Sequence, residues 1–302
     1  MAEQLYEVGD GVTLCAETFG DPAAPPLLLV MGLGMQMIRW HESLIDELTG
    51  AGLYVIRFDN RDSGRSTCFP EIPPPTPIQL VRRRFDPRQY TLSDMTRDTV
   101  GLLDALRLDR VHVAGASMGG MIAQTLAAEH PRRVRSLTSI MSSTGARWNG
   151  QPALRTYPLL LRRPARDRDA YIAQQVAVHA AIGSPGHPAD DPIFLEIARR
   201  SYERNPDPRG TGRQLAAVLA SGDRTRALQR ISAPTLVIHG DADRMIAVSG
   251  GRATARAIPG ADLHIVAGMG HDLPRDVWPE VLGALTAHVK SAERERSQLA
   301  RR

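Results

Sequence analysis

The sequence predicts an α/β protein with a mostly parallel sheet and helices on both of its faces. Between residues 27 and 141, short apolar runs alternate with stretches of helical periodicity, which is typical of such a sheet. The runs at 27–31 and 54–58 are almost wholly apolar, as expected for strands that are buried on both faces. The chain has 302 residues, 42% of them hydrophobic, so it can bury a large core.

The chain begins with a predicted hairpin. Strands at 4–8 and 12–19 flank the turn Gly9-Asp10-Gly11, whose residue types favour a reversal of the chain. The buried strand at 27–31 then runs into residues 32–36, where two glycines permit unusual backbone angles.

The next elements continue the alternation. A helix is predicted at 40–50, closed by glycine, and the buried strand at 54–58 runs into the polar turn 59–66. A short helix is expected at 78–85. A clear amphipathic helix follows through Leu106, with Thr91 or Ser93 as its cap.

The alternation stops after Ser143. Residues 146–231 show helical segments and no convincing strand. The predicted helices there are 152–161, 167–181, 192–204 and 212–220. Strand patterns return at 234–240 and 261–266, before a closing helix at 274–293. We therefore expect one core domain, residues 1–145 and 232–302, with an all-helical cap, residues 146–231, inserted between strands of one sheet.

One stretch carries a chemical signal. The strand pattern at 111–116 ends in Ser117, and a helix pattern continues to His130 before the next strand at 134–141. Residues 115–119 read Gly-Ala-Ser-Met-Gly, the G-x-S-x-G spacing of a strand–turn–helix nucleophile. The glycines allow a turn too tight for side chains, and Ser117 is expected to sit in a strained conformation at its apex.

A serine hydroxyl needs a base and an orienting carboxylate to act as a nucleophile. Parallel strands gather such groups at their carboxyl ends. Asp243 follows the strand at 234–240 and is the favoured acid, with Asp241 in the same turn as its competitor. His271 follows the strand at 261–266 in a glycine-rich loop, and the order Ser, Asp, His is that of the G-x-S-x-G hydrolases.

Two backbone donors are expected to stabilise the oxyanion of an acyl-transfer reaction. Met118 N–H opens the helix after Ser117, and Leu33 N–H lies in the loop after the strand at 27–31. The glycines beside Leu33 do not form a phosphate loop, because no Gly-Lys-Ser/Thr follows them.

These residues together resemble the α/β-hydrolase fold family from residue 27 to about residue 288. The blocks that carry the likeness are 31–34, 59–66, 115–119 and the pair Asp243 with His271. Within that family the sequence is similar to bacterial carboxylesterases and, more narrowly, to anthracycline (aclacinomycin-type) methylesterases. The segments that carry this similarity are 28–32, 55–62, 117–119 and 268–271.

The resemblance implies an eight-stranded sheet with the cap inserted after the sixth strand. It also implies hydrolysis of carboxylic esters through an acyl-enzyme, without a cofactor or metal. Two positions depart from many relatives: Met31 stands where they carry His, and Asp62 where they carry Gly. Ser117, in place of Asp, argues against the haloalkane dehalogenase and epoxide hydrolase branches.

The expected substrate pocket lies under the cap. Its predicted floor comprises Gly32, Gly34, Met35 and Met37, with Leu33 and Met118 beside them, whereas for Met121 a place in the core is favoured over one in the pocket. Such a floor favours small or medium apolar esters or methyl esters. The alternatives on the same residues are a cofactor-free perhydrolase or haloperoxidase, a carbon–carbon bond hydrolase, and a non-enzymatic receptor for a small molecule.

Composition excludes several other classes. The formal charge is +4, but Lys290 is the only lysine, and the arginines form no stripe with aromatic residues, so nucleic acid is not an expected partner. Two cysteines far apart give no metal or disulfide pattern. No apolar run suits a membrane span or a secretion signal. We expect a cytoplasmic monomer or homodimer that acts on a small-molecule ester.

Overall fold

The computed structural model describes residues 2–156, 165, 167–187, 191–204, 207 and 209–299. Its centre is one eight-stranded sheet in the order β1-β2-β4-β3-β5-β6-β7-β8, in which β2 is antiparallel to β1 and β4, and β3 to β8 run parallel. The strands are β1 (Gln4–Gly9), β2 (Val12–Phe19), β3 (Pro26–Val30), β4 (Tyr54–Phe58), β5 (Val111–Ala116), β6 (Val134–Ile140), β7 (Thr235–Gly240) and β8 (Asp262–Val266). The predicted sheet is confirmed.

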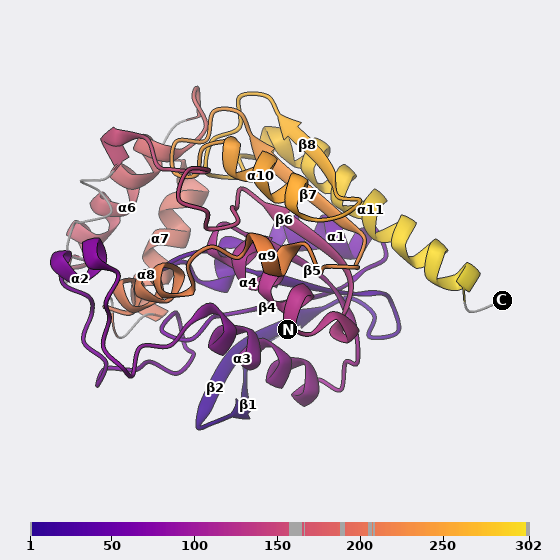
Figure 1. The fold of residues 1–302 in the computed structure, drawn as a ribbon, viewed down its shortest axis with the longest axis horizontal. Helices are drawn as coiled ribbons and strands as arrows, with labels where there is room; N and C mark the ends of the chain where they lie inside the picture. Colours follow the sequence, from indigo (N-terminus) through magenta and orange to yellow (C-terminus); the bar gives the residue numbers. More distant parts are fainter. Residues whose placement is uncertain are drawn as a thin grey trace.

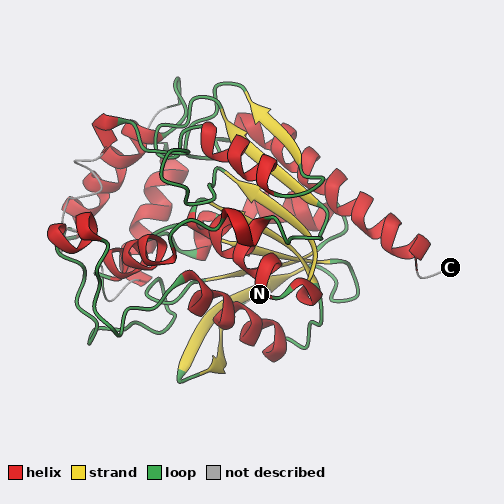
Figure 2. Ribbon diagram, viewed as in Figure 1, coloured by secondary structure: helices red, strands yellow, loops and turns green. Residues whose placement is uncertain are grey.

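Helices cover both faces of the sheet (Figures 1 and 2). The α-helices are α1 (Glu42–Gly50), α2 (Pro77–Arg82), α3 (Leu92–Ala105), α4 (Met118–Glu129), α6 (Arg168–Ile182), α7 (Pro192–Arg204), α8 (Gly210–Ser221), α9 (Thr225–Leu228), α10 (Ser249–Ala257) and α11 (Trp278–Leu299). Short 3₁₀ turns are η1 (Met37–Arg39), η2 (Pro131–Arg133), η3 (Leu154–Thr156) and η4 (Arg275–Val277).

The apolar run of β3 shows why the sheet needs cover on both sides. All five of its residues are buried. Leu27 and Leu29 pack with α1 and α11 in one cluster, whereas Leu28 and Val30 pack with α3, α4 and α10 in the other. Because alternate side chains point to opposite faces, a strand between two helical layers must be apolar throughout.

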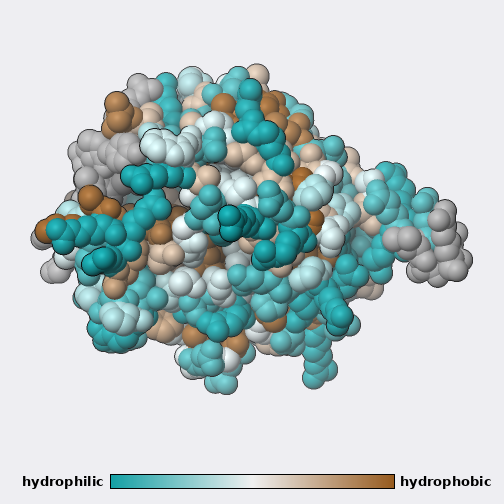
Figure 3. All heavy atoms as spheres, in the orientation of Figure 1, coloured by the Kyte–Doolittle hydropathy of each residue, from teal (hydrophilic) through white to brown (hydrophobic). Residues whose placement is uncertain are grey.

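Helix ends follow local chemistry, with some differences from expectation. Thr91 caps α3 in a reciprocal capping box with Asp94, so of the two expected caps it is Thr91 that serves. The helix expected from residue 40 begins at Glu42, because the His41 side chain accepts the Ser43 N–H and caps it there. The short helix α2 ends early, at a left-handed Arg83. It leaves Ile78 and Val81 exposed, and Figure 3 shows apolar spheres near this end of the molecule.

After β6 the chain forms helices α6, α7 and α8, which lie together beyond the sheet, at the left of Figure 1. Three of the expected cap helices therefore form close to their predicted bounds. Of the expected helix at 152–161, Leu154–Thr156 is a 3₁₀ turn and residues 157–161 lie outside the described residues. This gives the all-helical segment inserted after the sixth strand.

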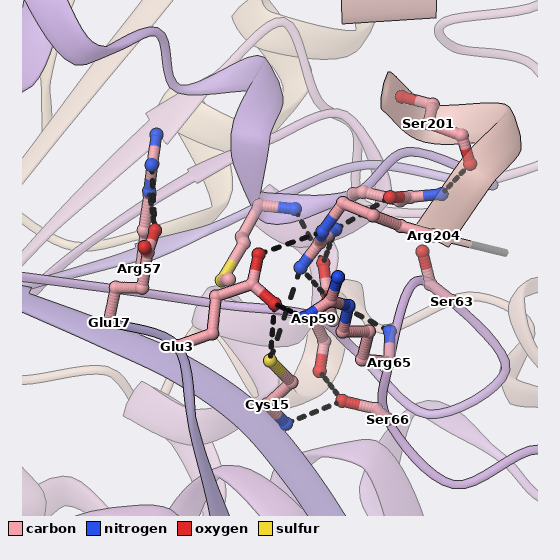
Figure 4. A network of polar contacts seen from close by, with 12 residues as sticks. Glu3, Cys15, Glu17, Arg57, Asp59, Ser63, Arg65, Ser66, Ser201 and Arg204 are labelled. Atoms are coloured by element: carbon pink, nitrogen blue, oxygen red, sulfur yellow. Dashed lines mark hydrogen bonds and ion pairs between the residues drawn. The ribbon is translucent and has the colours of Figure 1, made fainter. Parts of the chain in front are cut away.

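Buried polar contacts fasten this segment to the sheet (Figure 4). Arg204, at the end of α7, donates to the Asp59 carboxylate at 2.8 Å and to Glu3 at 2.9 Å. Burial raises the pKa of Asp59, and the Arg204 guanidinium opposes that rise. Cys15 lies beside the pair, and burial raises the pKa of its thiol to about 12. The turn after β4 is thereby tied to a helix about 145 residues away in sequence.

Candidate active site

Ser117 lies at a tight turn between β5 and α4. Its φ is +56° and its ψ is −120°, a conformation that side chains rarely adopt. A Cβ atom on Gly115 would lie 2.1 Å from the Gly119 carbonyl oxygen, and one on Gly119 would lie 2.1 Å from the Val30 carbonyl oxygen. Both positions therefore require glycine, and the turn they permit lifts the hydroxyl above the carboxyl end of β5.

The structure brings together the three side chains that the sequence placed after separate strands. Ser117 Oγ is 3.0 Å from His271 Nε2, and His271 Nδ1 is 2.8 Å from Asp243 Oδ2. Asp243 comes from the turn after β7 and His271 from the loop after β8. Hydroxyl, imidazole and carboxylate thus form a continuous hydrogen-bonded chain, the geometry of nucleophile, base and orienting acid.

Asp243 is held as a carboxylate by its surroundings. Its Oδ1 accepts the Met245 and Ile246 N–H groups, both at 2.8 Å. Burial alone would raise the pKa of Asp243, but His271, His239 and the Ile246 N–H hold that pKa well below its usual value. The side chain is completely buried, so its remaining oxygen is directed at His271 rather than at water.

The competing acid has a different role. Asp241 Oδ1 accepts the Gly268 N–H at 2.7 Å at an exposed position, which joins the turn after β7 to the loop after β8. His239, the next-to-last residue of β7, is fully buried. It lies 3.5 Å from Asp243 Oδ2 and bonds the Ile246 carbonyl oxygen. His239 therefore supports the turn that carries the Asp243 carboxylate. No sequence motif indicates this contact between residues four apart.

The loop that carries His271 is anchored to the cap. The His271 N–H donates to the Ile182 carbonyl oxygen at 2.8 Å, and Gly270 N–H donates to Ser184 Oγ at 2.8 Å. Asp272 in turn accepts both the N–H and the hydroxyl of Ser184. The end of α6 thus fixes the imidazole. Sequence reasoning missed Ser184 and Asp272, because nothing local signals a contact across almost ninety residues.

The two predicted oxyanion donors flank Ser117. Met118 is the first residue of α4, and the loop of Leu33 packs on the serine, since a Cβ on Gly32 would lie 3.0 Å from Ser117 Cβ. Neither N–H takes part in a hydrogen bond among the described residues. Gln214 of α8 accepts the Gly34 N–H at 2.8 Å and so holds this loop open from the cap side.

Ser117 and His271 line a cavity of about 620 Å³ between the sheet and the cap. Leu33, Gly34 and Met35 line it as well. The other walls come chiefly from η1, α1, α6, α7, α8 and the loop after β8, and include Arg39, Trp40, Leu44, Tyr171, Val178, His179, Ile182, Ile193, Phe194, Ile197, Leu215, Asp272, Leu273 and Trp278.

Some residues expected in the pocket lie elsewhere. Gly32 backs Ser117 rather than lining the cavity. Met37 is wrongly placed by the prediction: it is fully buried in a core cluster with Cys15 and Ile38, because the 3₁₀ turn η1 directs it inward. Met118 also packs its side chain into the core, and Met121 lies in the core as expected.

The described part of the chain also lacks the features of a metal site and of a membrane-spanning helix. There, no group of three or more His, Cys, Asp or Glu side chains is arranged to hold a metal ion. Within the same residues, no helix combines the length and apolar character needed to cross a bilayer.

Comparisons with known proteins agree with this fold. The family model described as alpha/beta hydrolase fold matches residues 25–274. The chain is 29% identical to the rhodomycin D methylesterase DauP of a Streptomyces species, over 94% of this chain and 97% of that protein. It is 27% identical to 3-oxoadipate enol-lactonase 2 of Acinetobacter baylyi, over 84% and 85%. An esterase structure from Exiguobacterium antarcticum superposes with a TM-score of 0.74 at 19% identity, covering 96% of this chain and all of that one.

Proposed function

The chain belongs to the α/β-hydrolase fold family, and we propose that it hydrolyses carboxylic esters through an acyl-enzyme on Ser117. The observation that carries the proposal is the hydrogen-bonded chain from Ser117 Oγ through His271 to the buried Asp243 carboxylate. It opens into a largely apolar cavity beside the N–H groups of Leu33 and Met118, which make no hydrogen bond to any residue that the structure describes. That set supplies each part that acyl transfer needs: nucleophile, base, orienting acid and oxyanion donors.

In the acylation half, Ser117 Oγ attacks the ester carbonyl carbon while His271 Nε2 takes the hydroxyl proton. The negative charge that develops on the carbonyl oxygen is met by the N–H groups of Leu33 and Met118. The carbon–oxygen bond to the alcohol then breaks, and His271 gives its proton to the leaving alkoxide. The products of this half are the free alcohol and an ester of Ser117.

In the deacylation half, water takes the place of the alcohol. His271 removes a proton from the water as its oxygen attacks the acyl carbon, and the same two amides stabilise the second oxyanion. Collapse breaks the bond to Ser117 Oγ, to which His271 returns the proton. Throughout both halves Asp243 stays ionised, because the contacts that lower its pKa persist, and it stabilises the imidazolium each time it forms.

Methyl esters are the favoured substrates within this class. A similar protein is named for methylesterase activity, and the match covers nearly the full length of both chains. The cavity, of about 620 Å³, has room for a large acyl group and is lined mainly by aliphatic and aromatic side chains.

The test is hydrolysis of 4-nitrophenyl butyrate and of bulky methyl esters by wild type and Ser117→Ala. We expect wild type to hydrolyse these esters. The kcat of S117A should be lower by at least about 10³-fold, and the activity that remains should come from the oxyanion donors. A fluorophosphonate probe should label wild type and a control, Ser93→Ala on the outer helix α3, but not S117A. Full activity in S117A would overturn the proposal, and cleavage of a β-diketone with no ester cleavage would replace it by carbon–carbon bond hydrolysis.

A further inference from the structure

Arg39 is a cation in the wall of the cavity that forms no ion pair within the part of the chain that the structure describes. It ends the 3₁₀ turn η1 and lines the same cavity as Ser117 and His271. Among the described residues, its guanidinium makes no ion pair within 4.0 Å and donates no hydrogen bond. Four arginines that are buried behave differently: Arg57, Arg61, Arg204 and Arg213 each bind a carboxylate.

Asp272 and Asp191 line the same cavity as Arg39, and both bind other parts of the chain. Asp272 accepts the N–H and hydroxyl of Ser184 with one oxygen, and its other oxygen lies 3.6 Å from His179 Nε2. Asp191 accepts the N–H groups at the start of α7, those of Ile193 and Phe194. Asp272 therefore acts on Arg39 through its charge, without an ion pair or hydrogen bond between the two described side chains, and Arg39 lines the cavity.

The guanidinium is also held in one orientation. Its central carbon lies 4.6 Å from the centre of the Phe194 ring, a cation–π contact. Phe194 itself stacks on His179, with ring centres 4.4 Å apart and planes inclined by 26°. Burial lowers the pKa of Arg39, an effect that Asp272 and Tyr171 oppose. With its carbon over the ring and its N–H groups unpaired, the side chain has the form that binds a carboxylate through two parallel hydrogen bonds.

We propose that Arg39 binds a carboxylate of the substrate, so that the enzyme acts on esters that carry a free acid group at a distance from the ester, such as half-esters of dicarboxylic acids. This rests on the proposed ester hydrolysis and adds to it the chemical class of the acyl group. The ester lies at Ser117, the apolar chain lies along the cavity wall, and the carboxylate lies at Arg39. A bidentate ion pair inside a partly closed cavity contributes to selection because a neutral acyl group would leave the arginine desolvated and unpaired.

The experiment compares matched substrates. Monomethyl succinate, glutarate, adipate and suberate are each paired with the methyl ester of the linear acid of the same length, and kcat/KM is measured for both. We expect wild type to prefer the half-ester at one chain length. Arg39→Gln should lower the ratio of the two kcat/KM values by about 30-fold or more, as when one partner of a buried charge pair is removed. Arg39→Lys should restore part of that ratio.

The matched control is Arg199→Gln, which removes the same charge from an exposed position of α7 outside the cavity wall. It should leave the ratio as in wild type. Binding gives a second readout: S117A should bind monomethyl adipate in calorimetry, and S117A combined with R39Q should not. Equal kcat/KM for charged and neutral esters, or an R39Q ratio like that of wild type, would overturn the role of Arg39 while ester hydrolysis stands. Arg39-dependent binding without hydrolysis of any ester would support this role and overturn the proposed function.

Discussion

Asp62 and Arg213 form a bidentate ion pair in which both side chains are completely buried, with Oδ1–Nη2 at 2.6 Å and Oδ2–Nε at 2.8 Å. Asp62 belongs to the turn after β4 and Arg213 to the cap helix α8. The φ of Asp62 is +63°, in the left-handed region that favours glycine. Its carboxylate also accepts the Tyr90 hydroxyl and the Phe69 N–H. Asp62 therefore holds a strained backbone conformation, and its ion pair with Arg213 of the cap stabilises it there.

Breaking this pair from one side should be costly. Arg213→Met leaves Asp62 charged and buried, so we expect the free energy of unfolding to fall by about 3–5 kcal/mol. In the double variant with Asp62→Gly, both the backbone strain and the orphaned charge are gone, so the loss should be smaller than the sum of the two single losses. Urea denaturation of the four proteins measures this. Additive losses would mean that the two residues are not coupled.

The acid of the proposed triad can be assigned by amide substitutions. Asp243→Asn keeps an oxygen for the backbone N–H groups but removes the charge that sets the His271 tautomer, so kcat should fall by about 10⁴-fold. Asp241→Asn keeps the acceptor for Gly268 N–H and does not touch His271, so kcat should stay near that of wild type. Steady-state kinetics with one ester measure both. The reverse pattern would move the acid to Asp241.

The loop that bears Leu33 can be displaced through its glycine. A Cβ at Gly32 would meet Ser117 Cβ at 3.0 Å and the Ala116 carbonyl oxygen at 3.2 Å, so Gly32→Ala should push the Leu33 N–H away from the oxyanion. We expect kcat to fall by about 10²-fold, with a small change in KM. Gly50→Ala, where a Cβ meets nothing within 4 Å, is the control and should not alter kcat. Equal kcat for G32A and wild type would exclude this loop from catalysis.

His112 gives a stability prediction that depends on pH. Burial in β5 lowers the pKa of His112 to about 4, against the pull of the nearby Glu293 carboxylate. Between pH 6.5 and about 4 the unfolded chain therefore takes up a proton that the folded chain refuses, so stability falls as pH falls through this range, by up to about 3 kcal/mol from this group.

Urea denaturation at pH 7, 5.5 and 4.5 measures this loss. His112→Gln keeps a polar partner for Ser136 Oγ but cannot titrate, so its free energy of unfolding should decline less steeply than that of wild type. The rest of the chain is the same in both proteins, so its contribution to the pH dependence cancels in the comparison. Parallel pH curves for the two proteins would contradict the assignment.

The pattern of the chain was sufficient for much of this description. Continuous apolar runs such as β3 can only be strands between two helical layers, and they led to the sheet and to the helical insertion after β6. The order of Ser117, Asp243 and His271 likewise led to the three side chains that meet, because parallel strands deliver their carboxyl ends to one edge.

Periodicity and spacing are local properties, and they determine which segments become strands or helices and where their ends lie. Which side chains meet across the fold depends on packing between segments far apart in the chain. The choice of Asp243 over Asp241 rests on which carboxylate accepts the turn's own N–H groups and reaches His271. The burial of Met37 in one cluster with Ile197 of the cap helix α7, and the contact of the Arg39 guanidinium with Phe194 of the same helix, likewise depend on how the cap packs against the sheet.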